Sequence, residues 1–233
     1  MEFAFMVILV TRPEPGATRT AEHLRALKFS PFILPLSKTI ALPVNVKDFS
    51  CDGVIATSEA AFLYLDPKIS EKLRLKPLYL VGKHTADVAK KAGFNNIELV
   101  ASDAKILADQ IDGPTTKSFL YLAGHVRRPD LERQMVQKFR YFRIFEIYDT
   151  VPIKLDDQQR KQIPQKIEAV MLYSALAAAG LEQISGYINH STVLLCLSAR
   201  IAHAVPRTLL NAPVIAYEPN EDAMLEGLKA VLA

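Results

Sequence analysis

Basic and hydroxyl side chains follow several short apolar runs of this 233-residue sequence, where strands would end and helices begin. They occur as Arg12, Ser58, the segment Gly82-Lys83-His84-Thr85, Ser174 and the segment Ser198-Ala199-Arg200. In parallel sheets covered by helices, ligands bind beyond the carboxyl ends of the strands. Helix N-termini at that edge expose backbone N–H groups and partial positive charge, which suit carboxylates and phosphates. We therefore expect an anion-binding surface made of Arg12, Ser58, Lys83, Thr85, Ser174, Ser198 and Arg200.

Each of these residue types also has a simpler interpretation. The hydroxyl residues could be helix N-caps alone, a role that is compatible with ligand binding. The three cations could be solvated surface residues, which is the usual state of a single basic side chain. Arg127 and Arg128 also follow an apolar run, and for them we favour the solvated interpretation.

Tyr148 is the candidate for proton transfer, because it begins an extended segment that ends at Ile153. A tyrosine with a pKa near ~10 is protonated at neutral pH and can donate a proton to a leaving oxygen without carrying charge. The alternative is a packing residue at the end of a strand.

Motifs of several common enzyme classes are absent. The sequence contains no G-x-G-x-x-G, G-x-x-x-x-G-K-[ST] or G-x-S-x-G, so dinucleotide-binding, P-loop and hydrolase interpretations lack their usual support. Its five histidines show no i, i+3 or i+4 pairing, so we expect no metal site. Tryptophan is absent and the other aromatic residues are scattered, which argues against stacking on single-stranded nucleic acid.

The composition is that of an ordinary globular protein, with half of the residues apolar and 23% charged. A net charge of +3 spread along the chain does not imply a nucleic-acid partner. The longest apolar run, Phe3 to Val10, is far shorter than the ~20 residues of a membrane span, and no basic segment of a signal peptide precedes it. We expect a cytoplasmic protein with no membrane partner, in which Cys51 and Cys196 are reduced core thiols.

Short apolar runs alternate with helical patterns along the chain, which predicts an α/β protein with parallel sheets. The expected strands are Phe5–Thr11, Ser30–Leu34, Gly53–Ala56, Leu78–Val81, Ile97–Val100, Ser118–Leu122, Ile144–Ile147, Ala169–Tyr173, Thr192–Leu197 and Pro213–Ala216. These are too many for one sheet of this size.

An internal repeat accounts for the number of strands. Ser58 aligns with Ser174 at an offset of 116 residues, and the same offset places Gly82–Ala86 on Ser198–Ala202. Two further matches, one of them looser, pair Leu99–Ser102 with Val214–Tyr217 and Val7–Arg12 with Phe119–Gly124. Four matches in the same order indicate a duplication into two similar α/β lobes.

Two extended segments, Leu36–Pro43 and Tyr148–Ile153, lie at equivalent places in the repeat and each contains a proline. We interpret them as the connections between the lobes, so Tyr148 would face the gap between them. Which half-unit packs with which stays open from these residues.

The residues of several segments, and the order in which the segments occur, resemble those of the uroporphyrinogen-III synthases over essentially the whole chain. They are Ile8–Glu14, Leu34–Leu36, Asp52–Ser58, Val81–Ala86 with Ala92–Phe94, Tyr148–Thr150 and Val214–Pro219. The resemblance implies two flavodoxin-like lobes joined by a two-stranded linker, with a cleft between them. It assigns residues 1–35 plus 152–233 to the first lobe and 38–149 to the second.

The resemblance also implies a reaction. It is the closure of the linear tetrapyrrole hydroxymethylbilane to uroporphyrinogen III, with inversion of the last pyrrole ring and loss of water, and without metal or organic cofactor. Tyr148 corresponds to the family tyrosine proposed to help the hydroxyl leave. Thr85 matches a threonine that lines the cleft, and Ser58 and Ser174 match the serines that follow strands.

The sequence departs from the family pattern in the second repeat. Ser198-Ala199-Arg200 stands where a glycine followed by hydroxyl residues is more common, so binding there would use Ser198 and Arg200. The segment from Tyr173 to Leu176 is also more apolar than usual, which leaves backbone donors in place.

Two other functions remain as alternatives, because a fold does not determine an activity. One is a non-catalytic two-lobed module that binds an anion or a tetrapyrrole, and the other is an enzyme such as a glycosyltransferase. No Asp-x-Asp motif supports the latter. For the synthase we expect a monomer that makes at most transient contact with hydroxymethylbilane synthase.

Overall fold

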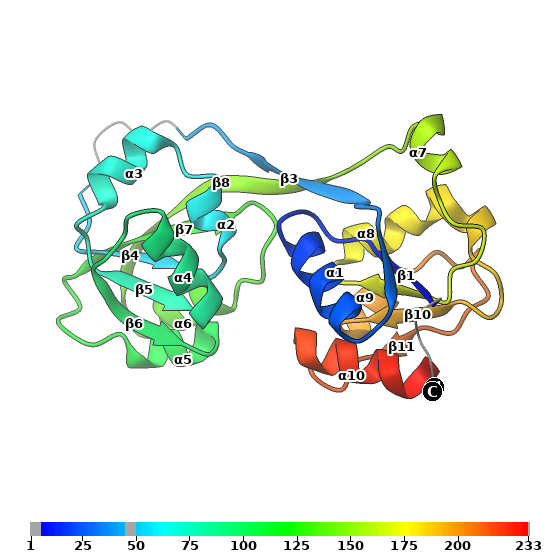
Figure 1. Ribbon diagram of the computed structural model, residues 1–233. Helices are drawn as coiled ribbons and strands as arrows, with labels where there is room; N and C mark the ends of the chain where they lie inside the picture. Colours follow the sequence, from blue (N-terminus) through cyan, green and yellow to red (C-terminus); the bar gives the residue numbers. More distant parts are fainter. Residues whose placement is uncertain (1–5, 45–49, 233) are drawn as a thin grey trace. The chain divides into compact units, whose positions relative to one another are not determined.

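The chain forms two sheets of mostly parallel strands in a computed structural model that describes residues 6–44 and 50–232 (Figure 1). The first sheet has the order β11-β10-β9-β1-β2, and the second has the order β3-β8-β7-β4-β5-β6. The strands of the first sheet are β1 (Val7–Val10), β2 (Ser30–Ile33), β9 (Ala169–Leu172), β10 (Val193–Cys196) and β11 (Val214–Ile215). Those of the second are β3 (Ser37–Ala41), β4 (Gly53–Ala56), β5 (Leu78–Val81), β6 (Ile97–Ala101), β7 (Ser118–Gly124) and β8 (Tyr141–Pro152).

Both sheets have the same arrangement of strands once the repeat is taken into account. The repeated segments place β4, β5, β6 and β7 on β9, β10, β11 and β1, and these strands occupy matching positions in the two sheet orders. The first sheet is the doubly wound order found in flavodoxin. The second sheet has the same spatial order of equivalent strands, but the chain begins at a different strand of that order, as in a circular permutation. The predicted α/β class with two flavodoxin-like sheets is confirmed.

The chain divides into two compact units, Met1–Thr39 with Val151–Ala233 (unit 1) and Ile40–Thr150 (unit 2). The strands β3 and β8 cross the two division points. Leu42 N donates to Ile147 O (2.9 Å), and Ile153 N donates to Leu36 O (3.0 Å). As the chain goes forward through β3 from Leu36 to Leu42, the bonded partner in or next to β8 moves backward from Ile153 to Ile147. The pair is therefore antiparallel. The segment expected as a short strand and the extended segment after it form one continuous β8.

In unit 1, helices cover both faces of the sheet. One face packs against α1 (Gly16–Ala26) and α10 (Glu221–Leu232), and the other against α8 (Ala175–Gly180), the 3₁₀ helix η1 (Leu181–Tyr187) and α9 (Ala199–Ala202). The short α7 (Asp157–Lys161) buries none of its own residues. Alternate strand residues point to opposite faces, so Ile8 and Val10 meet the first pair of helices and Leu9 meets the second group.

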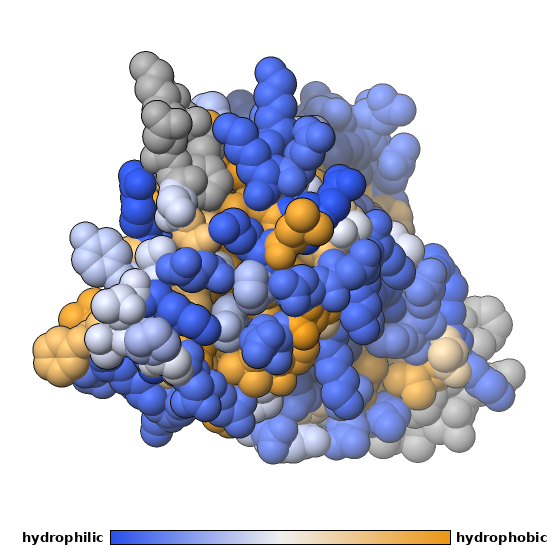
Figure 2. All heavy atoms as spheres, turned by 90° about the vertical axis from the view of Figure 1, so that its left-hand side faces the viewer, coloured by the Kyte–Doolittle hydropathy of each residue, from blue (hydrophilic) through white to orange (hydrophobic). Residues whose placement is uncertain are grey.

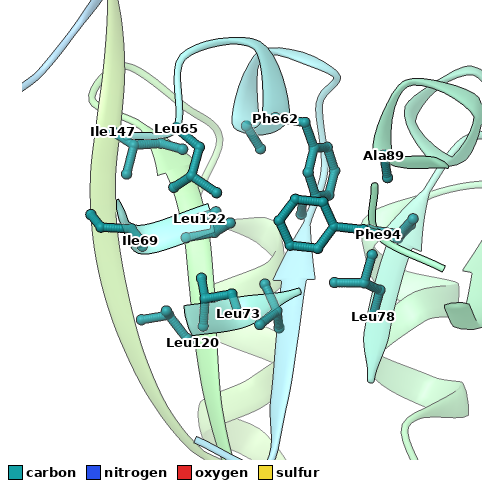
Figure 3. Close-up of a cluster of buried hydrophobic side chains, with 14 of the residues drawn as sticks. Phe62, Leu65, Ile69, Leu73, Leu78, Ala89, Phe94, Leu120, Leu122 and Ile147 are labelled. Atoms are coloured by element: carbon teal, nitrogen blue, oxygen red, sulfur yellow. The ribbon is translucent and has the colours of Figure 1, made fainter. Parts of the chain in front are cut away.

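Unit 2 is built in the same way. The helices α2 (Ala60–Leu63), α3 (Pro67–Leu73) and α4 (Lys83–Lys91) pack on one face of its sheet. The helices α5 (Ala104–Gln110) and α6 (Asp130–Gln137) pack on the other. The first of these cores contains an edge-to-face pair, Phe62 and Phe94, with ring centroids 5.1 Å apart (Figure 3).

The two cysteines are free and buried, which confirms the prediction of core thiols. Burial raises the pKa of Cys196 to about 12, and it also raises that of Cys51, so both are protonated thiols at neutral pH. Across the described ranges 6–44 and 50–232, none of the helices has the length and apolar character to cross a membrane. On the face shown in Figure 2, hydrophilic residues predominate and hydrophobic residues show through in separate patches.

We expect the Phe94→Ala variant to lose about 3–5 kcal/mol of stability, because it leaves a cavity in a core where Phe94 is 1% exposed. Phe139→Ala removes the same atoms from a side chain that is 83% exposed and should change stability by less than about 0.5 kcal/mol. Urea denaturation of both variants measures the difference. Equal losses would contradict the packing described for this core.

Candidate functional site

The half-buried Tyr148 ring lies against the end of the neighbouring strand β7. A Cβ atom added at Gly124 would lie 2.7 Å from Tyr148 Cε2 and 2.8 Å from its Cζ, so no other residue fits there without moving the ring. A backbone hydrogen bond also joins the two strands here, because His125 N donates to Tyr148 O over 2.8 Å. Tyr148 therefore rests directly on the last residues of β7.

A register shift between β7 and β8 aims the Tyr148 side chain. Ala123 lies opposite Glu146, whereas Gly124 lies opposite Tyr148, so β8 holds one extra residue, Ile147, at this point. In a regular strand Ile147 and Tyr148 would point to opposite faces. Here both pack against the core of α2, α3 and α4. The bulge thus turns Tyr148 toward the strand end.

Tyr148 is neutral at physiological pH. Burial raises its pKa, while the nearby Ser58 hydroxyl and the charge of Arg127 act in the opposite direction. A protonated phenol can donate its proton to an oxygen of a ligand. Unit 2 thus brings together two of the predicted site residues, Tyr148 and Ser58.

Ser58 also bonds to the first residue of α2, whose N-cap is Glu59. Ser58 Oγ accepts from Ala60 N at 3.3 Å. The preceding residue, Thr57, shares a 2.9 Å hydrogen bond with Tyr121 OH, and burial raises the pKa of Tyr121 to about 12. Sequence reasoning missed Tyr121, because nothing local to it indicates that β7 and β4 are neighbours.

The loop after β5 places the next two predicted residues. Gly82 has φ of 84°, a left-handed conformation that favours glycine, and it precedes the first residue of α4. Lys83 is then exposed in the first turn, while Thr85 is buried with 6% of its surface accessible. His84, between them, bonds to Glu59 with 2.5 Å between Nε2 and Oε2. Thr85 lies inward and Lys83 outward at the same helix start.

Arg127 differs from its predicted state. Its Nη1 donates to Gly124 O (2.8 Å), His125 O (3.2 Å) and Glu146 Oε1 (2.8 Å), and its Nε donates to Glu132 Oε1 (2.6 Å). Its side chain is only 20% exposed. The solvated interpretation of Arg127 is therefore wrong, because its guanidinium is held by three segments. For the next residue, Arg128, the solvated interpretation agrees with its exposed position.

In unit 1, Arg12 lies at the end of β1 in a compact polar cluster. Its guanidinium stacks over the Tyr173 ring at 4.3 Å from the centroid, and its Nη1 pairs with Glu221 Oε2 at 2.9 Å. Thr20 Oγ1 donates to the other oxygen of Glu221 over 2.7 Å. A Cβ at Gly16 would lie 2.5 Å from Arg12 Nε. Arg12 is thus a packed and paired cation rather than a freely solvated one.

The remaining predicted residues follow β9 and β10, which are neighbours in the sheet. Ser174 caps α8, since its Oγ accepts from Ala177 N at 3.1 Å. Ser198 begins α9 without a capping bond, and its buried Oγ has no hydrogen-bond partner among the described residues. Arg200 is exposed in the first turn of α9. Within the same described ranges the buried Tyr173 OH has no partner by geometry, and burial raises the pKa of Tyr173.

We expect the ion pair between His125 and Glu146 (2.8 Å) to stabilise the fold only within a limited pH range. The hydrogen bond with Glu146 raises the pKa of His125 above 6.5, so its contribution is complete below pH 6.5 and is lost as pH rises through the raised value. Hydrogen bonds from His125 and Arg127 lower the pKa of Glu146 below 4.5, so its contribution is present above pH 4.5 and is lost as pH falls through the lowered value.

The variant His125→Gln should therefore lower Tm, relative to the unaltered chain, most between pH 4.5 and pH 6.5. The difference should shrink as the solution becomes alkaline. Thermal unfolding across pH measures it. His190→Gln, at an exposed histidine, is the matched control and should show no such profile. A Tm difference for His125→Gln that is independent of pH would contradict the role of the ion pair.

Comparisons with known proteins agree with this architecture. Among curated protein sequences none matches the chain significantly. The structure of a uroporphyrinogen-III synthetase from Helicobacter pylori superposes with a TM-score of 0.64 at 16% identity, over 98% of this chain and 100% of that one. A mutant uroporphyrinogen III synthase from Thermus thermophilus superposes with a TM-score of 0.52 at 17% identity, over 97% and 98%. At such identities these neighbours establish the fold.

The family itself is established by sequence. The family profile described as uroporphyrinogen-III synthase HemD matches residues 18–226, which is most of the chain. That range includes Tyr148 and all of the predicted strand-end residues except Arg12. The chain therefore belongs to the uroporphyrinogen-III synthase HemD family.

Proposed function

We propose that this chain closes hydroxymethylbilane to uroporphyrinogen III, with inversion of the last pyrrole ring and loss of water. Membership of the HemD family supports this activity. The observation that carries the chemistry is the neutral Tyr148, whose ring is held against the Gly124 backbone at the end of β7 and lies near Ser58. The reaction is a dehydration and ring closure that transfers no electrons overall, so it needs no redox cofactor.

Tyr148 is the proposed catalytic residue. The substrate's terminal hydroxyl must leave to generate an azafulvene electrophile, and a proton donated to that oxygen turns it into water. Burial raises the pKa of Tyr148 and so keeps its proton in place until the oxygen accepts it. The contact with Gly124 limits the directions in which the phenol can point.

Substrate binding is proposed for the strand-end residues of each unit. Hydroxymethylbilane is a polyanion with acetate and propionate groups, which suit backbone N–H groups, hydroxyls and cations at helix starts. Unit 2 offers Ser58, Lys83 and Thr85, and unit 1 offers Arg12, Ser174, Ser198 and Arg200. The buried Ser198 Oγ supports a polar ligand there, since a buried hydroxyl that lacks a partner in the described ranges costs stability until it finds one.

Arg12 would act with its partner rather than alone. Glu221 already neutralises part of its charge, and a quarter of the Arg12 side chain stays accessible. A substrate carboxylate would therefore bind beside an existing ion pair. This arrangement favours orientation of the ligand over strong electrostatic attraction.

The main task of such a site is conformational. The unassisted bilane closes without inversion, so the protein has to favour attack by the last ring at its substituted carbon, which gives a spiro intermediate that reopens and closes inverted. Selecting one near-attack geometry from several is worth large factors in rate when the reactant is held rigidly. Many weak anchors on a flexible polyanion serve that purpose better than a single strong one.

We infer that the chain acts as a monomer in the cytoplasm and takes its unstable substrate from hydroxymethylbilane synthase through at most transient contact. The duplicated fold supports a monomer, because both sets of strand-end residues come from one chain. Size-exclusion chromatography with light scattering tests the monomer.

The isomer of the product tests the function directly. When hydroxymethylbilane is generated in situ by its synthase and this protein is added, we expect uroporphyrinogen III as the main product, resolved by chromatography after oxidation. The control omits this protein and should give isomer I alone. Only isomer I from protein shown to be folded would overturn the proposed synthase and favour a binding module that does not turn over.

Tyr148→Phe tests the proposed proton donor. We expect kcat to fall about 100-fold, the lower end of what general acid catalysis contributes, with KM nearly unchanged. Tyr141→Phe is the matched control, because Tyr141 lies at the other end of the same strand and is 72% exposed. An unchanged kcat for Tyr148→Phe would remove this residue from the mechanism.

A further inference from the structure

Arg127 connects three segments around the base of Tyr148. Through Nη1 it bonds the carbonyls of Gly124 and His125 at the end of β7 and the carboxylate of Glu146 in β8. Through Nε it bonds Glu132 in α6. This guanidinium thus satisfies acceptors from the strand end, the bulged strand and the following helix together.

The two carbonyls that Arg127 holds belong to the residues that support Tyr148. The Gly124 backbone is the surface on which the ring rests, and His125 N donates to the Tyr148 carbonyl. Without Arg127, both carbonyls would lose this donor, and the Gly124–His125 peptide group would be held only through its N–H, by the Tyr148 carbonyl. The surface beneath the Tyr148 ring would then be fixed less firmly.

The geometry requires an arginine rather than any cation. Nε and Nη1 point in different fixed directions of a planar group, so they can reach Glu132 on one side and the carbonyls and Glu146 on the other. A lysine ammonium has a single nitrogen at the end of a flexible stem and cannot span both sets. Lysine at this position would keep the positive charge but lose the set of N–H donors that point in fixed, different directions.

Arg127 also neutralises carboxylates where a polyanionic substrate would bind. Glu132 and Glu146 both pair with it, at 2.6 Å and 2.8 Å. Without Arg127 their charges would repel a ligand carboxylate at the end of β7. Its positive charge is nevertheless committed to these partners, so Arg127 acts on the reaction through them.

We propose that Arg127 is a positioning residue, which fixes the strand end on which the Tyr148 ring rests. This role rests on the proposed function, since it assigns Tyr148 the reacting proton. Arg127 itself touches no reacting atom in this account.

The test compares Arg127→Lys with Arg128→Lys, the same substitution at the next residue, which is exposed. For Arg127→Lys we expect kcat to fall about tenfold to 100-fold with KM within about twofold, because a displaced catalytic group slows the reaction by such factors. Arg128→Lys should leave both constants within about twofold. A fall in stability with kcat unchanged would overturn the proposal, since it would show a structural role only.

A second readout needs no turnover. Protein labelled with 3-fluorotyrosine carries eight fluorine reporters, and the resonance that disappears in Tyr148→Phe belongs to Tyr148. We expect Arg127→Lys to shift or split that resonance and Arg128→Lys to leave it in place. An unshifted resonance would overturn the proposal. Failure of the isomer assay would instead overturn the proposed function, so the two failures are distinguishable.

If Arg127→Lys does not fold, Glu132→Gln carries the test. The amide oxygen of glutamine still accepts a hydrogen bond from Nε, but without the negative charge, so the guanidinium is held less firmly. We expect a smaller displacement of the Tyr148 resonance and a smaller fall in kcat. No change in either measurement would contradict the positioning role.

Discussion

The close contact between the Tyr148 ring and the Gly124 backbone is the constraint on which the candidate site depends. It requires glycine at the last position of β7, because a Cβ there would lie 2.7 Å from the ring. It also requires the extra residue in β8, since regular alternation would point Tyr148 to the other face of the sheet. The bulge, the glycine and the guanidinium of Arg127 therefore all contact the same strand end beside Tyr148.

Most strands and the sheet class could be predicted from the sequence, because buried parallel strands are short apolar runs that can be recognised locally. The range Gly53–Ala56 and the range Leu78–Val81 coincide with β4 and β5. The length of β8 could not be predicted in this way. Tyr141 and Arg143 are exposed, so the predicted strand covered only Ile144–Ile147, although pairing with β7 begins at Tyr141.

The candidate residues divide according to whether their roles are local. Ser174 follows a strand and caps the next helix, so its place could be predicted from neighbouring residues. Arg127 and Arg128 look alike in sequence, yet Arg127 is held by distant carboxylates while Arg128 is exposed. Glu132 and Glu146 become partners of Arg127 because α6 and β8 both pack beside the end of β7. Such pairings depend on tertiary structure, and a single sequence carries no local signal for them.

In each unit, an arginine that follows a strand is paired with glutamate side chains, although the residues are not equivalent in the repeat. Arg12 pairs with Glu221 in unit 1, and Arg127 pairs with Glu132 and Glu146 in unit 2. Both guanidiniums are thus compensated, whereas Lys83 and Arg200 stay exposed at helix starts. In the proposed function, these paired cations add little net positive charge with which to hold a polyanion. The proposed hydroxyl and backbone donors would then supply most of the affinity, and their directional bonds would restrict the ligand's conformation, which inversion of the last ring requires.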